Sequence, residues 1–285
     1  MDGWRHRRAL AKKYKTFRPC LMGSSRPTVV ILCGGRGTRL RERTETVPKA
    51  LVEIGGKPIL WHVIGIYAAQ GFERFLLATG YLGEMVEELV AETAWPERLE
   101  IACVDTGQDT PTGGRLARLR GQLDGETFCA TYADGVADVD LDALLDFHAA
   151  HGAAATVTVV RPELQWGVAR IGPDDAVEGF VEKPRSEHWI NGGFFCFEPA
   201  ALDYLDEDSV LERKPLERLA ADGQLKAFRH EGFWDCMDTY KDAVVLNDLW
   251  STGDAPWPTF PADFDLSRPI APENTKSAVP GGSWE

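Results

Sequence analysis

The chain has 285 residues and a formal net charge of −13, with 44% hydrophobic, 26% charged and 10% aromatic residues. This length allows a substantial core, and the composition is that of a soluble globular protein, which excludes collagen-like, disulfide-scaffold and wholly disordered chains. Residues 1–26 hold eight Lys and Arg against one acid, so residues 27–285 hold 23 basic and 43 acidic residues, a net of −20. A body this acidic is a poor non-specific partner for nucleic acid, and an anionic ligand would need placed cations, backbone N–H groups or a metal.

The two ends of the chain differ from its middle. Residues 1–26 lack the apolar stretch of a signal peptide and are expected to form a disordered basic extension, with Met22 as an alternative start. A basic tail that touches a membrane or nucleic acid is the other reading of this segment. Residues 253–285 are rich in proline and predict an irregular C-terminal tail, which leaves residues 27–252 as the folded domain.

The cysteines and the hydropathy indicate a location. The six cysteines form no C-x-x-C pair, and most lie in apolar runs, as Cys33 and Cys196 do. We therefore expect free, buried thiols in a reducing compartment, and hence a cytoplasmic protein. No apolar run approaches the length that spans a bilayer, so we expect no membrane partner, and the acidic charge of residues 27–285 makes us expect no nucleic acid partner.

Strand and helix patterns alternate over the first half of the domain. In chain order, we expect strands and helices at 28–33 (strand), 58–70 (helix), 74–79 (strand), 82–92 (helix), 99–104 (strand), 127–132 (strand) and 140–151 (helix). This alternation predicts an α/β fold with a Rossmann-like mixed, mostly parallel central sheet and helices on both faces.

The pattern changes after residue 153, where strand-like segments follow one another with short gaps. They occupy 154–161, 167–171, 176–181 and 192–197, and predict a smaller β-rich lobe added to the same sheet. A last helix begins near Thr239, because Asp242 lies three residues further on, as in a capping box.

A loop rich in glycine and arginine directly follows the first strand, from Leu32 to Leu40. Glycines allow the backbone to approach a phosphate chain closely, and arginines supply charge and fork geometry for phosphate oxygens. The loop is neither a P-loop nor a dinucleotide-binding G-x-G-x-x-G turn. A plain glycine turn with solvated arginines is the alternative.

Three charged residues follow strands or turns at places where ligands bind. Lys49, held between Pro48 and an apolar stretch, is either aimed at a ligand or simply a surface lysine. Asp134 ends a buried strand, at the sheet edge where open α/β sheets bind ligands, and a carboxylate there suits Mg²⁺. Asp238 lies between a strand and the last helix, and is a second candidate metal ligand, with Asp235 as the competing choice.

The segment 181–184 joins a glutamate to a lysine. Lys183 suits a phosphate and Glu182 suits hydroxyl groups, although an ion pair at a strand end is the alternative. Trp166-Gly167 and Asn191 flank this segment and offer an aromatic face, open backbone and an amide, which are the groups that bind sugars.

The ordered motifs resemble those of the sugar-1-phosphate nucleotidyltransferases, and within them the glucose-1-phosphate cytidylyltransferase branch. They are G-G-x-G-T-R-L, P-K-[PA], E-I-G-G-K-P-I-L-W-H, G-Y, D-T-G, T-G-G-R-L, Y-x-D-G-V-A-D, E-K-P, I-N-G-G-F-F and F-W-x-x-M-D-T, over about residues 28–260. The resemblance implies a nucleotidyltransferase domain over 27–252. It also implies transfer of a nucleotidyl group from an NTP, first CTP, to a sugar 1-phosphate, first α-D-glucose 1-phosphate, with release of pyrophosphate.

The same resemblance implies roles for individual residues. Arg39 and Lys49 would be catalytic, Asp134 and Asp238 would hold Mg²⁺, and Lys183, Glu182, Gly167 and Asn191 would bind the sugar phosphate. The nucleotide would lie on Leu32, Gly34, Gly35, Gly37, Thr38, Arg39, Thr112 and Gly113. The NTP and the sugar 1-phosphate would be the small-molecule partners, and members of such families are often homo-oligomers.

Departures from the pattern leave the substrates open. Cytidylyltransferases usually read K-P-K-P where this chain has Val47-Pro48-Lys49-Ala50, which loses one lysine, and P-K-A-L also occurs in guanylyltransferase relatives. The stretch between Leu89 and Asp105 is short, Trp166 is bulky, and Leu211-Glu212 lacks the usual tryptophan. GTP or another NTP with a modified hexose, heptose or cyclitol phosphate is the alternative pair. A non-catalytic nucleotide-sugar-binding regulatory subunit is the alternative from another class.

Overall fold

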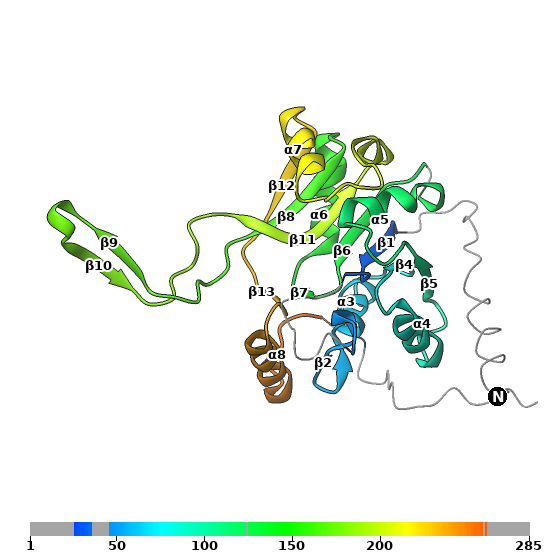
Figure 1. Ribbon diagram of the computed structural model, residues 1–285, viewed down its shortest axis with the longest axis horizontal. Coiled ribbons are helices and arrows are strands. Elements are labelled where there is room, and N and C mark those ends of the chain that lie inside the picture. The colour runs from blue at the N-terminus through cyan, green and yellow to red at the C-terminus, as the bar shows by residue number, and fades with distance from the viewer. Residues whose placement is uncertain (1–25, 36–45, 124, 259, 261–285) are drawn as a thin grey trace, which may run out of the picture.

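The structure is a computed structural model that describes residues 26–35, 46–123, 125–258 and 260 (Figure 1). Its strands are β1 (Thr28–Leu32), β2 (Glu53–Ile54), β3 (Lys57–Pro58), β4 (Arg74–Thr79), β5 (Glu100–Asp105), β6 (Phe128–Tyr132), β7 (Gly135–Ala137), β8 (Ala155–Val160), β9 (Val168–Ile171), β10 (Val177–Val181), β11 (Ile190–Phe197), β12 (Leu225–His230) and β13 (Trp234–Cys236). Its helices are α3 (Ile59–Ala68), α4 (Gly83–Glu92), α5 (Thr112–Arg118), α6 (Leu141–His151), α7 (Lys214–Ala221) and α8 (Tyr240–Thr252), with 3-10 turns η3 (Lys49–Leu51), η4 (Arg120–Gln122), η5 (Pro173–Asp175) and η6 (Pro199–Tyr204).

The central sheet has seven strands in the order β12-β8-β11-β6-β1-β4-β5. β1 pairs in parallel with β4 and β6, β4 with β5, and β8 with β12. β11 alone among these strands is antiparallel to its neighbours, β6 and β8. The predicted mixed, mostly parallel α/β sheet is therefore confirmed.

Both faces of this sheet are covered, as β1 illustrates. All five residues of β1 are buried, so the strand reads as a continuous apolar run and not as an alternating one. Val29 and Ile31 join a core with α3, α4, α6 and α8, whereas Val30 and Leu32 join a second core with α5 and α7. Successive side chains point to opposite faces, and each face meets its own layer of helices.

Local helix signals read from the sequence are confirmed at two helices. The carboxylate of Asp140 accepts a hydrogen bond of 2.9 Å from the Ala143 N–H and caps α6, which ends at Gly152 with a φ of 64°. At α8, the side chains of Thr239 and Asp242 form the reciprocal bonds of a capping box. These caps satisfy backbone N–H groups that a helix start leaves unpaired.

The strands expected beyond residue 153 divide into two groups. β8 and β11 extend the central sheet, whereas β9 and β10 pair with each other in a separate hairpin. Figure 1 shows this hairpin projecting away from the body. The predicted β-rich lobe is thus partly an extension of the sheet and partly a projecting arm.

The first residues of the predicted tail pack onto the core. Trp257 is 3% exposed and Phe260 is 5% exposed, although both lie outside regular helices and strands. The Trp257 indole donates to Nδ1 of His62 at 3.2 Å, and the rings of Trp250 and Trp257 stack at 6.2 Å. This segment therefore adds buried aromatic area to the core around α3.

His62 predicts an acid-sensitive step in stability. Its Nε2 lies 2.9 Å from the Ile54 carbonyl and its Nδ1 accepts from Trp257, so the neutral ring satisfies both contacts. Burial lowers the pKa of His62 to about 4, below its ordinary value of 6.5. The unfolded chain therefore binds a proton first, and the free energy of unfolding falls by about 3 kcal/mol as the pH drops from above 6.5 to 4.

Urea unfolding of wild type and His62→Phe across pH 4–7 measures this effect. The wild type should lose more stability than the variant below pH 6.5, because the phenyl ring takes up no proton. Parallel pH profiles for the two proteins would show that His62 carries no such linkage.

Candidate active site

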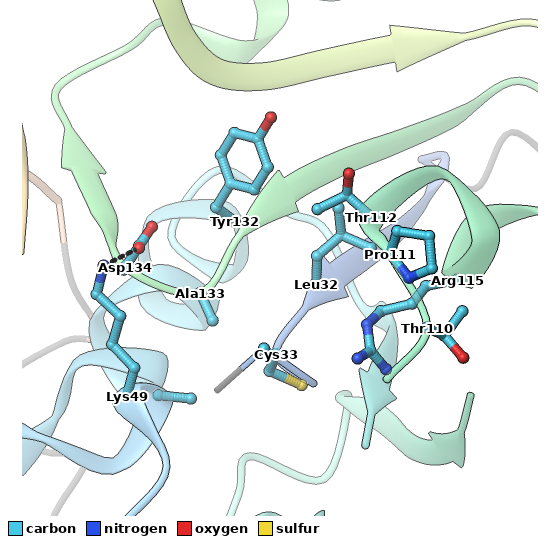
Figure 2. Close-up of a pocket in the computed structure, with 12 residues that line it drawn as sticks. Leu32, Cys33, Lys49, Thr110, Pro111, Thr112, Arg115, Tyr132, Ala133 and Asp134 are labelled. Atoms are coloured by element: carbon cyan, nitrogen blue, oxygen red, sulfur yellow. Dashed lines mark hydrogen bonds and ion pairs between the residues drawn. The ribbon is translucent and has the colours of Figure 1, made fainter. Parts of the chain in front are cut away.

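A pocket of about 290 Å³ opens at the carboxyl ends of β1 and β6. The chain leaves β1 toward β4 and β5 on one side and returns to β6 on the other, so the strand order reverses here. Open α/β sheets bind ligands at such switch points. The lining residues are Leu32, Cys33, Gly35, Lys49, Ala50, Thr110, Pro111, Thr112, Arg115, Tyr132, Ala133 and Asp134. Figure 2 shows Lys49 and Asp134 on one side and Arg115 and Thr110 on the other.

Lys49 joins two carboxylates that are far apart in the sequence. Its Nζ lies 2.5 Å from Oδ2 of Asp134 and 2.6 Å from Oδ1 of Asp238. Lys49 comes from η3, Asp134 from the end of β6, and Asp238 from the turn between β13 and α8. The Met237 N–H donates to the Asp134 carbonyl at 2.9 Å, which fixes the two carboxylate-bearing turns against each other.

The electrostatics of this cluster keep the lysine charged. Burial alone lowers the pKa of Lys49, but Asp134 and Asp238 outweigh burial, and the pKa stands above its ordinary value. One ammonium therefore faces two carboxylates in a half-buried site. Such a cluster carries a net negative charge, to which a divalent cation is complementary.

Asp235, the alternative to Asp238, lies in a different environment. Its Oδ1 accepts from the Cys236 N–H at 2.8 Å, whereas the two carboxylates bonded to Lys49 are those of Asp134 and Asp238. Burial raises the pKa of Asp235 to about 6, with the Cys236 N–H opposing and Asp242 adding to the rise. The geometry thus brings Asp238, and not Asp235, into contact with Lys49.

The start of the glycine loop is held by a buried arginine. Arg115 is 3% exposed, and its Nη2 donates to the Gly34 carbonyl at 2.8 Å. Its Nη1 bonds the Thr79 carbonyl, the Thr106 hydroxyl and the Gly107 carbonyl. A Cβ at Gly34 would lie 2.1 Å from Arg115, so the glycine is needed here to admit the guanidinium.

Arg115→Met should destabilise the fold by about 3 kcal/mol or more, since several buried carbonyls would lose a charged donor. Urea unfolding measures this loss, and Arg120→Met, on the exposed 3-10 turn that follows α5, is the matched control. If Arg115→Met unfolded at the wild-type urea midpoint, the guanidinium would not be holding Gly34.

The structure places the residues of the predicted nucleotide side in different surroundings. Leu32, Gly35 and Thr112 line the pocket. Gly113 packs elsewhere: a Cβ there would lie 2.8 Å from the Ser209 carbonyl oxygen, so its missing side chain admits a neighbouring loop. Three predicted residues lie outside the described residues: Gly37, Thr38 and Arg39.

The structure does not bring the four residues of the predicted sugar-phosphate side together in one place. Asn191 at the start of β11 donates from Nδ2 to the hydroxyl of Tyr132, a residue of the pocket wall, at 3.1 Å. Gly167, Glu182 and Lys183 instead lie at the base of the β9–β10 hairpin, and none of them lines this pocket. A Cβ at Gly167 would lie 2.8 Å from Oε2 of Glu182, so these two residues are close neighbours.

Sequence reasoning assigned no role to three residues of the site. Arg115 stood in the quoted T-G-G-R-L motif and Tyr132 in Y-x-D-G, but a sequence does not show that they line one pocket. Thr110 precedes the first of these motifs.

Cys33 lines the pocket as an inert thiol, because burial raises its pKa to about 12.

No helix in the parts of the chain that the structure describes is long and apolar enough to cross a membrane. Five cysteines in those parts carry free thiols: Cys33, Cys103, Cys129, Cys196 and Cys236.

Comparison with known proteins agrees with this geometry. The glucose-1-phosphate cytidylyltransferase of Salmonella typhimurium is 43% identical over 254 residues, covering 81% of this chain and 98% of that protein. A probable glucose-1-phosphate cytidylyltransferase of Bacillus subtilis is 41% identical over 249 residues, covering 80% and 98%. Among solved structures, HddC from Yersinia pseudotuberculosis in complex with GMP-PN has a TM-score of 0.62 at 21% identity, covering 79% of this chain and 100% of that one, which shows the shared fold.

The family comparison covers the central sheet, the pocket and the Lys49 cluster. The profile of the family described as nucleotidyl transferase matches residues 28–239, which span β1 through the turn that bears Asp238. That match agrees with the sheet of the structure and with the pocket at its switch point. It also agrees with the relatives, which cover four fifths of the chain. The chain belongs to the nucleotidyl transferase family.

Proposed function

We propose that this protein transfers a cytidylyl group from CTP to α-D-glucose 1-phosphate and releases pyrophosphate. The observation that carries the proposal is the contact of Lys49 with Asp134 and Asp238 beside a pocket at the switch point of the sheet. The names and the 41–43% identity of the two bacterial relatives support the choice of CTP and glucose 1-phosphate.

The carboxylate pair fits Mg²⁺. The Lys49 ammonium already lies between Asp134 and Asp238, which shows that the two oxygens converge on one cation. Mg²⁺ is commonly held by one or two protein carboxylates together with substrate phosphates, so Asp134 and Asp238 would hold it. When bound, the ion would neutralise charge on the phosphate chain.

The chain's own residues would orient both substrates. Gly35 would bring its backbone to the nucleotide phosphates, Leu32 and Thr112 would form the nucleotide wall, and Lys49 would neutralise phosphate oxygens near the reacting centre. Gly34, Gly37, Thr38, Arg39 and Gly113 complete the proposed nucleotide side, with Arg39 beside the departing pyrophosphate. Asn191, Gly167, Glu182 and Lys183 form the proposed sugar-phosphate side.

The proposed reaction needs no covalent enzyme intermediate. An oxygen of the sugar phosphate attacks the α-phosphorus of the NTP in line, a P–O bond forms, and the bond from the α-phosphorus to the bridging oxygen breaks. The electron pair leaves with pyrophosphate. Such a transfer depends on positioning and charge neutralisation, which the cluster and the pocket supply.

A second substrate pair has its own support. Ala50 lines the pocket next to Lys49, at the position where the P-K-A-L pattern of guanylyltransferases departs from that of cytidylyltransferases. A mannose-1-phosphate guanyltransferase of Schizosaccharomyces pombe is 33% identical over 230 residues, covering 78% of this chain and 63% of that protein. GTP, or another NTP, with a modified hexose, heptose or cyclitol phosphate is therefore the alternative.

A panel of NTPs against sugar 1-phosphates, read by pyrophosphate release in Mg²⁺, decides between these pairs. Preference for CTP with glucose 1-phosphate supports the proposal, and preference for GTP with another sugar supports the alternative. Folded protein that releases no pyrophosphate from any pair, yet binds a nucleotide sugar, would be a regulatory subunit instead.

We further propose that the protein is a homo-oligomer whose β9–β10 hairpin packs against a second copy. Trp166 is 74% exposed and Phe180 is 65% exposed on this arm, with Val168, Ile171, Val177 and Val181 also exposed. An isolated two-stranded hairpin is marginally stable in water, so a cover is expected. The arm also bears Glu182 and Lys183, and a second copy would bring these residues to a pocket.

Light scattering after size exclusion tests the oligomer against the chain mass of 31.5 kDa. The molar mass of the wild type should be a multiple of the chain mass. The double variant Trp166→Ser with Phe180→Ser should have a lower molar mass. Phe147→Ser, on α6, is the control, and a monomeric wild type would refute the proposal.

The free thiols of the described cysteines support the proposed cytoplasmic location.

A further inference from the structure

One carboxylate joins residues from the two sides of the pocket. The Tyr132 hydroxyl donates to Oε1 of Glu212 at 2.5 Å, and the Thr112 hydroxyl donates to Oε2 of the same carboxylate at 2.7 Å. Asn191 donates to the Tyr132 oxygen at 3.1 Å. A continuous hydrogen-bonded chain therefore runs from the proposed sugar side, through Tyr132 and Glu212, to the proposed nucleotide side.

The backbone around Glu212 is fixed against the first turn of α5. The Leu211 N–H donates to the Thr112 hydroxyl at 2.9 Å, and the Gly114 N–H donates to the Ser209 carbonyl at 2.9 Å. A Cβ at Gly114 would lie 2.1 Å from the carbonyl oxygen of Glu207. The two glycines after Thr112 thus allow the segment 207–212 to dock closely and place Glu212 beside the pocket.

The environment of Tyr132 determines the direction of each hydrogen bond in this series. Burial raises the pKa of Tyr132, and the Glu212 carboxylate raises it further, so the phenol stays protonated and donates to Glu212. Its oxygen then accepts from Nδ2 of Asn191, whose Oδ1 accepts from the Gly193 N–H at 2.8 Å. The amide of Asn191 is thereby held in one orientation.

From this geometry we propose that Glu212 is a positioning residue that couples the nucleotide subsite to the sugar subsite. The inference rests on the function proposed above. Glu212 acts through Thr112 on one side and through Tyr132 and Asn191 on the other. One side chain therefore helps set how far the sugar phosphate lies from the nucleotide, which an in-line transfer requires to be fixed.

Steady-state kinetics of Glu212→Gln test the coupling, with the NTP and sugar 1-phosphate that the wild type turns over best. A glutamine cannot accept from both hydroxyls as the carboxylate does, so the KM for each substrate should rise, and kcat/KM should fall roughly tenfold. Glu207→Gln is the matched control, because Glu207 lies in the same loop but pairs with Arg118 at 2.8 Å. It should behave as the wild type.

Tyr132→Phe separates the two branches. This variant removes the hydroxyl between Asn191 and Glu212 but leaves the Thr112–Glu212 bond, so the KM for the sugar 1-phosphate should rise while the KM for the NTP stays. Glu212→Gln that leaves both KM values unchanged, or moves only one of them, would overturn the inference. An inactive wild type would instead refute the proposed function.

A double-mutant cycle tests the bridge without any substrate. In the first cycle, the shifts in urea midpoint caused by Tyr132→Phe and by Glu212→Gln should not sum to the shift of the double variant. In the second cycle, the same should hold for Thr112→Val, Glu212→Gln and their double variant. Additive midpoints in both cycles would show that Glu212 bonds neither hydroxyl, and would overturn the inference whatever the activity.

Discussion

Asp134→Asn should lower kcat/KM roughly a thousandfold while leaving the fold intact. The substitution keeps the shape of the side chain but removes one of the two negative charges that converge on the Lys49 ammonium, 2.5 Å away. The remaining carboxylate of Asp238 would hold Mg²⁺ alone. The cation that neutralises the phosphate chain would then bind more weakly, and half-maximal activity should need more Mg²⁺.

A Mg²⁺ titration of pyrophosphate release measures both effects, and removal of the metal with EDTA should abolish wild-type turnover. Asp140→Asn is the matched control, since asparagine also caps helices and Asp140 lies at the start of α6. Wild-type turnover by Asp134→Asn, at the same Mg²⁺ requirement, would remove Asp134 from the site.

Lys49→Met should lower kcat/KM roughly a hundredfold or more, because a placed charge that faces the developing negative charge of the transition state is lost. Its loss also leaves the carboxylates of Asp134 and Asp238 facing each other without the ammonium between them. The variant should therefore unfold at a lower urea concentration than the wild type.

Parallel assays of Lys226→Met supply the control, because Lys226 is an exposed lysine on β12. A Lys49→Met enzyme that unfolds at lower urea but keeps nearly full activity would show that the lysine serves structure and not the reaction.

The periodicity of the sequence predicted the elements that carry the site. The apolar run of β1 and its following glycines, and the helix from Asp140 to Gly152, follow from local rules of burial and capping, which need no tertiary information. The placement of Asp134 at a ligand-binding edge followed from the strand before it. These signals are local; the structure confirms the strand and the helix, and it places Asp134 in the lining of the pocket.

The sequence does not show which residues from distant parts of the chain come together at the site. Asp238 follows Lys49 by 189 positions, and only the topology brings them to 2.6 Å. In the sequence Arg115 is only the cation of the T-G-G-R-L motif, but the structure places it in α5, where the missing side chain at Gly34 leaves room for its buried guanidinium. The strand patterns within 167–181 predicted strands added to the central sheet, and this was wrong, because β9 and β10 pair only with each other and a strand pattern does not show which strands pair.

The acidic composition acquires a sharper meaning from the site. Both proposed substrates are polyanions, and a body with a net charge of −20 over residues 27–285 cannot attract them by its overall charge. Lys49, the proposed Mg²⁺ and the arginines of the glycine loop would reverse the sign locally. Turnover should therefore depend on these few cations far more than on ionic strength.

Phosphorus NMR of the protein mixed with CTP, α-D-glucose 1-phosphate and Mg²⁺ tests the proposed reaction most directly. We predict that pyrophosphate and CDP-glucose appear in equal amounts as both substrates decline, and that Asp134→Asn slows both signals together. Folded wild type that forms neither product, or that releases phosphate from CTP without forming CDP-glucose, would contradict the assignment of nucleotidyl transfer to the Lys49–Asp134–Asp238 site.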